Sequence, residues 1–442
     1  MDCLNHTCIG ESHIRAGKVC QDYSLSFNLD KLAVAVVSDG HGSPRYFRSD
    51  KGAEFAAETC KELVTEFVAN FDKSLIMDKP FTQCAAKCDN NDYAVDDLHL
   101  VFNQLFKSII TVWYQKIEQH ASQNPITVTE RENLLPEWIA DFENDVKIEE
   151  CYGCTLLAAV VTPDYWFAIH IGDGKIISLN DNPVFQEPVP WDDRCLDNVT
   201  TSLSRADALY CIRYCYGGNK SIPDAIFLCS DGVEDGYEAP EILCSELYVE
   251  IAKRLVDNGK QKTFEDIQET LPSLSKKSSH QDDMSLAIVY DLNKLSDHLD
   301  IYKKWKLQTQ LQIIEEKIAE HQKRKNKKLI EKQTQMLEYQ QVLHQKEQAE
   351  KDVAQITEEY TTAKEEWQDM EEKVNALLSL FSSKKRKVDE LTDSLGKAET
   401  TLANLQKEYD YSQRALQIAE NEVAEENETL QNLLKKKQEL CN

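Results

Sequence analysis

The chain has 442 residues and a formal charge of −27, with 77 acidic against 50 basic side chains. This length exceeds that of one ordinary domain. The acidic excess argues against a sequence-independent nucleic-acid binder, which needs Lys and Arg to displace counterions, and against a peripheral protein on anionic lipid.

The composition changes near residue 300. Residues 1–300 carry 50 acidic and 26 basic side chains, whereas residues 301–442 carry 27 acidic and 24 basic side chains, one glycine and no proline. Most of the negative charge therefore belongs to the first part. We expect two domains, residues 1–297 and residues 298–442.

The N-terminus lacks the basic region and apolar run of a secretory signal, and no window approaches the roughly 18 apolar residues of a membrane span. We therefore expect a soluble cytoplasmic protein that binds neither membrane nor nucleic acid, with mostly reduced cysteines. Cys151 and Cys154 have CxxC spacing, and Cys84 and Cys88 lie four apart, but neither pair has an obvious second pair at zinc-finger spacing. Ordinary buried thiols are favoured over a zinc site.

Four short apolar runs rich in β-formers each border an Asp. They are 32–37 before Ser38-Asp39-Gly40-His41-Gly42, 166–171 before Gly172-Asp173-Gly174, 225–229 before Ser230-Asp231-Gly232-Val233-Glu234-Asp235, and 284–290 after Asp282-Asp283. The runs 166–171 and 175–179 predict a hairpin closed by the Gly-Asp-Gly turn. Helices are expected over about 49–71, 97–121, 203–215 and 240–258.

Carboxylates at strand ends beside glycine can converge on one edge of a sheet. Four or five of them without Lys or Arg neighbours would repel one another unless cations lie between them. Mg²⁺ and Mn²⁺ suit such a site because they take oxygen ligands. A single Asp-Gly usually marks only a turn, so the interpretation depends on the ordered set of four.

The ordered motifs resemble those of a known enzyme family. They are Cys20-Gln21-Asp22, Ser38-Asp39-Gly40-His41-Gly42, Gly153-Cys154-Thr155-Leu156, Gly172-Asp173-Gly174, Ser230-Asp231-Gly232-Val233-Glu234-Asp235 and Asp282-Asp283-Met284-Ser285. Together, over about residues 8–292, they resemble the metal-dependent Ser/Thr protein phosphatases of type 2C, bacterial-style branch. The resemblance implies an α+β fold, a four-layer α/β/β/α sandwich of two antiparallel sheets flanked by helices, with the metal site at one end.

The resemblance also implies roles for individual residues. Asp39 bridges two Mg²⁺ or Mn²⁺ ions, the Gly40 carbonyl joins one of them, and Asp231 and Asp282 hold the other. Asp173 and Asp235 match a third, weaker metal site of some members, Asp22 orients metal-bound waters, and His41 matches the general acid that protonates the departing Ser or Thr oxygen. In such a site a hydroxide bridging the metals attacks phosphorus directly, with no phospho-enzyme.

Four positions depart from the family pattern, one of which is Gly174, in place of the residue before the common Arg of the Gly-Asp-Gly segment. Gly17 stands where many members carry the Arg that holds the substrate phosphate, which leaves Arg15 and Lys18 as nearby substitutes. Gln21 replaces the usual Glu and keeps an oxygen for a water or metal contact, and Asp283 stands where Asn is frequent. Every aspartate expected to bind metal directly is present, which favours an active enzyme.

The C-terminal part is periodic. Apolar residues three and four apart run from Val353 to Phe381 and again from Val388 to Leu440, where only Ser412, Glu426 and Lys437 interrupt the second series. This 3.5-residue repeat is typical of a coiled coil. Because the basic run 382–387 breaks the register, either one long helix pairs with another copy of the chain, or two helices broken near 382–387 fold back as an antiparallel hairpin.

Two functions follow from these observations. The first is a metal-dependent phosphatase acting on phosphoserine and phosphothreonine in a phosphoprotein, with an opposing Ser/Thr kinase and a coiled coil for self-association or a partner helix. The second is a catalytically inactive phosphatase-fold scaffold, or a phosphoprotein-binding module, that acts through the coiled coil.

Overall fold

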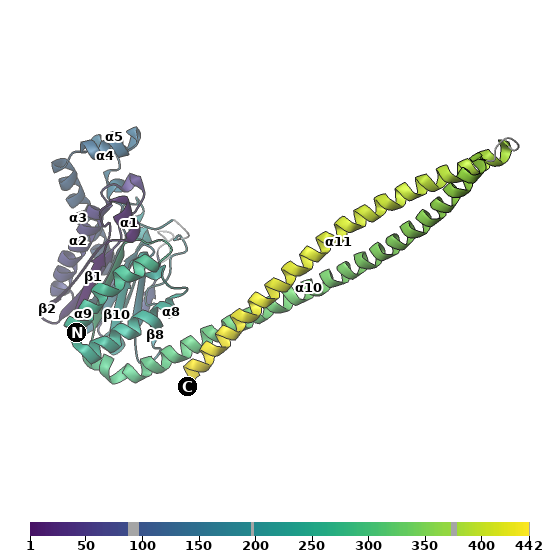
Figure 1. The fold of residues 1–442 in the computed structure, drawn as a ribbon. Coiled ribbons are helices and arrows are strands. Elements are labelled where there is room, and N and C mark those ends of the chain that lie inside the picture. Colours follow the sequence, from purple (N-terminus) through teal and green to yellow (C-terminus); the bar gives the residue numbers. More distant parts are fainter. Residues whose placement is uncertain (87–96, 196–198, 373–377, 442) are drawn as a thin grey trace. The chain divides into compact units, whose positions relative to one another are not determined.

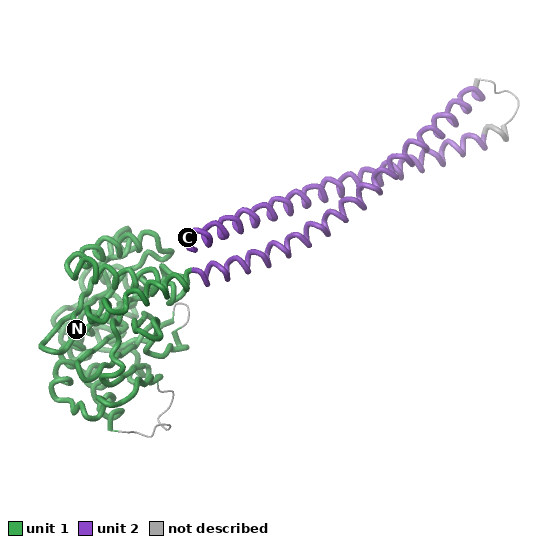
Figure 2. Tube along the Cα trace, turned by 90° about the horizontal axis from the view of Figure 1, so that it is seen from below, with its two compact units in different colours: residues 1–310 green, residues 311–442 purple. Residues whose placement is uncertain are grey.

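The computed structural model describes residues 1–86, 97–195, 199–372 and 378–441, with the side chains of 372–381 left aside. Cys88 and the seam positions Val374, Leu377 and Phe381 lie outside that description. The chain divides into two compact units, residues 1–310 and residues 311–442, coloured separately in Figure 2. The domain boundary expected from the composition lies at residue 297.

The first unit contains two antiparallel sheets. Its strands are β1 (Asp2–Cys8), β2 (Tyr23–Leu29), β3 (Leu32–Ser38), β4 (Thr82–Cys84), β5 (Leu156–Val161), β6 (Tyr165–Ile171), β7 (Lys175–Leu179), β8 (Phe185–Gln186), β9 (Arg213–Gly218), β10 (Ala225–Cys229) and β11 (Met284–Tyr290). One sheet has the order β1-β11-β10-β7-β8, and the other has the order β2-β3-β5-β6-β9-β4.

The α-helices are α1 (Glu11–Ala16), α2 (Ser49–Asn70), α3 (Asp97–Gln123), α4 (Val128–Asn133), α5 (Pro136–Glu143), α6 (Ala208–Cys211), α7 (Asp231–Glu234), α8 (Pro240–Leu243), α9 (Val249–Lys277), α10 (Leu292–Glu372) and α11 (Leu378–Cys441). Short 3-10 turns occupy Pro44–Tyr46, Lys73–Leu75, Ile148–Tyr152 and Asn219–Ser221, and a π turn occupies Cys244–Tyr248. Figure 1 shows where the larger elements lie.

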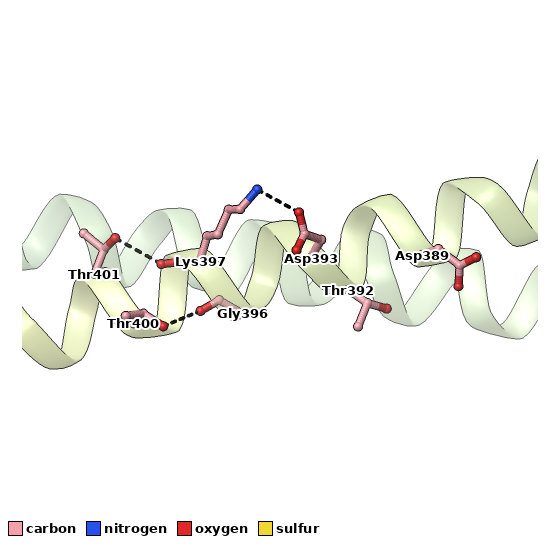
Figure 3. Close-up of a pocket in the computed structure, with 7 residues that line it drawn as sticks. All are labelled: Asp389, Thr392, Asp393, Gly396, Lys397, Thr400 and Thr401. Carbon is pink, nitrogen blue, oxygen red and sulfur yellow. Dashed lines mark hydrogen bonds and ion pairs between the residues drawn. The ribbon is translucent and has the colours of Figure 1, made fainter.

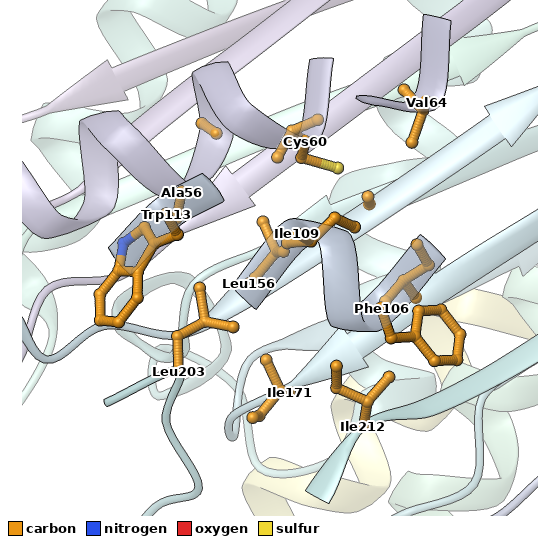
Figure 4. Close-up of a cluster of buried hydrophobic side chains, with 14 of the residues drawn as sticks. Ala56, Cys60, Val64, Phe106, Ile109, Trp113, Leu156, Ile171, Leu203 and Ile212 are labelled. Atoms are coloured by element: carbon orange, nitrogen blue, oxygen red, sulfur yellow. The ribbon is translucent and has the colours of Figure 1, made fainter. Parts of the chain in front are cut away.

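Three apolar cores separate the four layers. Helices α2 and α3 cover the six-stranded sheet, where Cys60 and Trp113 are buried with Leu156 (Figure 4). A second core, which includes Val37 and Ile226, lies between the sheets. A third core packs α9 and the first turns of α10 on the five-stranded sheet. This arrangement confirms the predicted four-layer α/β/β/α sandwich.

The predicted hairpin of 166–171 with 175–179 is wrong. Strand β6 pairs with β5 and β9 in one sheet, whereas β7 pairs with β10 and β8 in the other, so the Gly-Asp-Gly segment crosses between the sheets. Gly172 has a φ of 119°, and a Cβ there would lie 2.5 Å from Cβ of Thr155. Both strands are buried along their whole length, and burial alone does not reveal which neighbour a strand takes.

The helix expected over 203–215 is also wrong for most of its length. Only Ala208–Cys211 is helical, and Arg213–Gly218 forms β9, which pairs with β6. Tyr214 and Tyr216 enter the core under α3, whereas Cys215 between them enters the core between the sheets. This alternation is that of a strand buried on both faces, and pairing with β6 outweighs local helix propensity.

The second unit is an antiparallel hairpin of two helices. The cross-helix contacts are Glu315–Lys437 (2.8 Å), His321–Glu426 (2.8 Å), Lys332–Glu420 (3.1 Å), Tyr339–Tyr409 (2.9 Å) and Glu366–Lys384 (2.7 Å). Partner numbers fall along α11 as they rise along α10, so the helices run in opposite directions. The chain thus takes the fold-back arrangement, with the basic run 382–387 inside α11 rather than at the break between the helices.

Two of the three interruptions of the predicted seam have partners on the other helix of this hairpin. Glu426 accepts from His321 and lies 3.3 Å from Lys328, while Lys437 pairs with Glu315. The third, Ser412, donates its hydroxyl to the carbonyl of Glu408 in its own helix. The outer surface of α11 is shallowly indented where Gly396 lies between Thr392 and Thr400 (Figure 3).

Candidate active site

One cavity of about 580 Å³ in the first unit gathers most of the predicted site residues. Its lining consists of Gln21, Asp22, Asp39, Gly40, His41, Gly42, Ser43, Tyr46, Thr155, Asp173, Val199, Thr200, Ser202, Ser204, Arg205, Asp231, Asp282 and Asp283. The aspartates come from ends of strands in both sheets, as the sequence predicted for carboxylates beside glycine.

Two hydrogen bonds with Thr155 hold the backbone of Asp39. Asp39 follows β3 directly, its N–H donates to Oγ1 of Thr155 (2.9 Å), and its carbonyl accepts from the N–H of Thr155 (2.8 Å). Gly40 is required at the next position, because a Cβ there would lie 2.5 Å from the carbonyl oxygen of Gln21. The carboxylate is thus presented to the cavity by a rigid turn.

The cavity concentrates negative charge in a desolvated place. Burial and the neighbouring Asp22 and Asp231 raise the pKa of Asp39 well above its usual range. Burial and the nearby Asp173 raise the pKa of Asp231 to about 6, and burial raises the pKa of Asp173. These shifts all have the sign expected when carboxylates crowd together without a cation.

Asp283 has a different environment. One of its carboxylate oxygens accepts the N–H of Gly10 (2.6 Å), the other accepts the N–H of Gln21 (2.6 Å), and Nδ1 of His13 lies 3.0 Å away. Burial alone would raise the pKa of Asp283, but the contact with His13 and the two backbone donors lower it overall. Asn could not serve both backbone donors, since its side chain has one carbonyl oxygen.

His13 was not recognised from the sequence. Its ring and the carboxylates of Asp282 and Asp283 place three possible metal-ligand atoms within 4.8 Å of one another. Asp283 already accepts the backbone N–H groups of Gly10 and Gln21. The cluster of His13, Asp282 and Asp283 is therefore better explained as a structural contact that holds the segment before Gln21 than as a metal site. No short motif marks His13, which comes close only through the fold.

Gln21 holds the backbone of His41. Its Nε2 donates to the carbonyl oxygen of His41 (3.0 Å) and to Oγ of Ser49 (2.6 Å), and the Ser49 hydroxyl donates to the same carbonyl (3.0 Å). A Glu at position 21 could not make the first of these bonds, since a carboxylate only accepts. The sequence analysis expected only the side-chain oxygen of Gln21 to matter, but its NH2 group also positions the backbone of His41.

The His41 ring lies against Tyr46 at a centroid distance of 4.8 Å, in an edge contact. Its backbone N–H donates to the carbonyl of Gly153 (3.1 Å), where any Cβ would lie 2.6 Å from Cδ2 of the His41 ring. Burial lowers the pKa of His41 to about 4. The imidazole is therefore neutral near pH 7.

Three predicted residues do not line the cavity. The Asp235 carboxylate lies 2.6 Å from Nδ1 of His280, although it is close enough to raise the pKa of Asp173 and Asp231. Arg15 is exposed and its Nε donates to the carbonyl of Glu11 (3.3 Å), and Lys18 is exposed as well. The cation that does line the cavity is Arg205, which the sequence motifs did not single out.

Cys151 and Cys154 are buried in the core beneath α2, and burial raises the pKa of each thiol to about 12. Neither belongs to the group of possible metal ligands found among the described residues. Their environment is that of ordinary core cysteines. Every cysteine in the described ranges is a free thiol.

The cavity residues fit divalent cations. The donor set is almost wholly carboxylate oxygen, the chemistry that Mg²⁺ and Mn²⁺ prefer. Oδ2 of Asp22 and Oε1 of Gln21 are buried and have no hydrogen-bond partner among the residues that the structure describes. Asp39, Asp231 and Asp282, with the Gly40 carbonyl, are the groups of the cavity that could hold such ions, and Asp173 lies among them.

Residues 9–276 match the family model described as protein phosphatase 2C, and the chain belongs to this family. In fold, it is similar to the serine/threonine phosphatase Stp1 from Staphylococcus aureus (16% identity, 66% of this chain and 95% of that chain, TM-score 0.39). It is also similar to a serine/threonine phosphatase of S. agalactiae (15% identity, 65% and 98%, TM-score 0.36) and to a sex-determining protein of C. elegans (14% identity, 69% and 67%, TM-score 0.41). No curated protein matches the sequence.

Among the helices of the described ranges, none combines the length and the apolar character needed to cross a membrane.

Proposed function

We propose that the first unit is a Mg²⁺- or Mn²⁺-dependent phosphatase acting on phosphoserine and phosphothreonine in proteins. The observation that carries the proposal is the meeting of Asp39, Asp173, Asp231 and Asp282 in one cavity. Burial and mutual repulsion raise the pKa of Asp39, Asp173 and Asp231, and a cation bound between these carboxylates would relieve the repulsion. Family membership supports the reaction class.

In this proposal Asp39, Asp231 and Asp282, with the Gly40 carbonyl, hold two divalent ions, and Asp173 with Asp235 assists a third. Ions bound there would supply an activated water as the nucleophile and would shield the charge of the phosphate. Asp22 orients water beside the ions through its buried carboxylate. The negative charge of the cavity is thereby offset before a phosphorylated side chain enters.

His41 is the proposed donor of the proton to the departing Ser or Thr oxygen. Gln21 and Ser49 hold its backbone carbonyl, and Tyr46 restricts its ring. The phosphate dianion opposes the effect of burial on the pKa of His41, since a nearby negative charge favours the imidazolium. The proposed role requires the imidazole to carry a proton once the substrate is bound.

The test is hydrolysis of an aryl phosphate, and of matched phosphoserine, phosphothreonine and phosphotyrosine peptides, with Mn²⁺ and after chelation. Asp39→Asn and Asp231→Asn should each lower kcat/KM by about 100-fold or more, as expected when a metal ligand is lost. Asp164→Asn, at an exposed carboxylate paired with Lys73, is the control and should be unaffected. Metal-independent turnover, or none above the two variants, would favour the inactive scaffold.

For the second unit we propose a docking role rather than self-association through its seam. The seam of α10 is filled by α11 of the same chain, including matched ion pairs such as His321 with Glu426. Only the outer faces then remain for a partner helix. Light scattering should give a monomer for the full chain, and a dimer that becomes monomeric on removal of 311–442 would contradict this role.

A further inference from the structure

The position at which many family members hold the substrate phosphate carries no cation in this chain. Gly17 ends α1 with a φ of 65°, and nothing lies within 4 Å of the place where its Cβ would be. Arg15 and Lys18, the nearest cations in sequence, do not line the cavity. A phosphate that enters must therefore find its positive partner elsewhere.

Arg205 is a cation that lines this cavity. Among the described residues that line the cavity it is the one Arg or Lys, and the others offer mainly acids, hydroxyl groups, the Gln21 amide and the His41 ring. Its side chain is 43% exposed, so an entering anion can reach it. It stands on the segment 199–205, which forms one wall of the cavity.

Hydrogen bonds connect the segment 199–205 to residues next to Thr155 and Asp173. Leu203, buried in the core seen in Figure 4, donates its N–H to the carbonyl of Cys154 (3.0 Å), and Ser202 donates its hydroxyl to the same carbonyl (3.0 Å). The hydroxyl of Thr201 accepts the N–H of Gly172 (3.0 Å). The backbone leading to Arg205 is thus fixed relative to Thr155 and Asp173.

Asp207 orients the guanidinium. Nε of Arg205 lies 2.8 Å from Oδ1 and Nη2 lies 3.1 Å from Oδ2 of Asp207, a two-pronged contact. A guanidinium has five N–H donors, and this contact uses two of them. Three donors remain, both on Nη1 and one on Nη2, and the Cys211 thiol also lies within hydrogen-bonding reach of the guanidinium. A guanidinium held in a fixed plane has the geometry in which Arg binds phosphate best.

We propose that Arg205 binds the phosphate of the substrate and that Asp207 is its positioning residue. The proposal rests on the proposed phosphatase function, since it names the group that receives the phosphate at that same cavity. It explains how the site can lack a cation at Gly17 and remain a phosphate site.

The chain provides a matched control in Arg194. This residue makes the same two-pronged contact with an Asp two residues away, with Nε at 2.8 Å and Nη2 at 2.9 Å from the oxygens of Asp192. Its side chain is 37% exposed, but it does not line the cavity. Arg194→Ala therefore removes an equivalent charge without touching the proposed phosphate position.

Two measurements on the full chain test the proposal. The first is the KM for a phosphothreonine peptide with Mn²⁺. The second is the Kd of inorganic phosphate by calorimetry with Mg²⁺, which requires no turnover. Arg205→Ala should raise both by about 10- to 100-fold, the range for one charged hydrogen-bonding group, and leave kcat within a few-fold. Arg205→Lys should raise KM and Kd by less than Arg205→Ala does. Asp207→Ala should give values between those of the wild type and Arg205→Ala, and Arg194→Ala should match the wild type.

The outcomes separate this proposal from the phosphatase function. Suppose that the wild type turns over substrate and that Arg205→Ala and Arg205→Gln have unchanged circular dichroism. If both variants then have the KM and the Kd of the wild type, Arg205 is not the phosphate ligand. If the wild type shows no turnover but binds phosphate more tightly than Arg205→Ala, the phosphate site stands and the catalytic function fails. A wild type that binds no phosphate overturns the Arg205 proposal.

Discussion

Cutting the chain at two nearby points should have very different effects. A chain that ends at Gln310 keeps the whole first unit. A chain that ends at Asp300, close to the boundary expected from composition, loses Tyr302 and Trp305. Tyr302 is 0% exposed in the core beneath the five-stranded sheet, and Trp305 stacks on Phe185 with an interplanar angle of 7°.

The size of the effect follows from these contacts. Removing a buried aromatic side chain usually costs about 3–5 kcal/mol. The Tyr302 hydroxyl also donates to Oδ2 of Asp224 (2.5 Å), an oxygen that lies 2.7 Å from Nδ1 of His298, and a hydrogen bond to a charged group contributes about 1.5–3 kcal/mol. The free energy of unfolding of the chain ending at Asp300 should therefore be about 5 kcal/mol or more lower than that of the chain ending at Gln310. Tyr302→Phe, which removes only the hydroxyl, should lower it by about 2 kcal/mol.

Urea unfolding followed by tryptophan fluorescence, with a chelator present to remove metal-dependent stability, measures the difference. With an m value of about 3 kcal/mol/M, the chain ending at Asp300 should have a midpoint at least about 1.5 M lower than the chain ending at Gln310. Tyr302→Phe should shift the midpoint of the chain ending at Gln310 by about 0.7 M. Coincident midpoints for the two truncated chains would refute the assignment of these helical turns to the first unit.

Three further predictions concern single side chains. Asp283→Asn should destabilise the first unit by about 2 kcal/mol in urea, because one of two buried backbone N–H groups loses its acceptor; an unchanged midpoint would count against this role. Gln21→Glu should lower kcat several-fold by setting a carboxylate against the His41 carbonyl, while Gln21→Ala, lacking that repulsion, should lose less; the reverse order would contradict the argument. The hydrogen bond from His321 lowers the pKa of Glu426, so its contribution to the hairpin is present above the ordinary carboxyl pKa and is lost as pH falls through the lowered value. The protection of amides near Glu426, taken relative to the intrinsic exchange rate at each pH, should therefore fall at low pH in the wild type, and an equal fall in Glu426→Gln would sink the idea.

Much of the candidate site was accessible to sequence reasoning because its chemistry lies in short local patterns. Asp39, Asp173 and Asp231 lie within two residues of the end of an apolar run that forms a strand. A carboxylate at a strand end keeps its place whichever strand the run pairs with. Arg205 and His13 belong to no such pattern. Arg205 lies in a segment that the sequence suggested to be helical, and its position follows from bonds between that segment and Cys154.

By itself, the sequence determined the division into an acidic, strand-rich part and a long periodic part, the positions of most strands, and most of the carboxylates that meet in one cavity. These properties follow from local composition and from periods of two and three to four residues, which report burial. Only the tertiary structure decided that β6 and β7 join different sheets, that Arg205 faces the acids, and that α10 pairs with α11 of its own chain. Periodicity shows that a face is buried but not which partner buries it, and that choice depends on contacts between residues far apart in the chain.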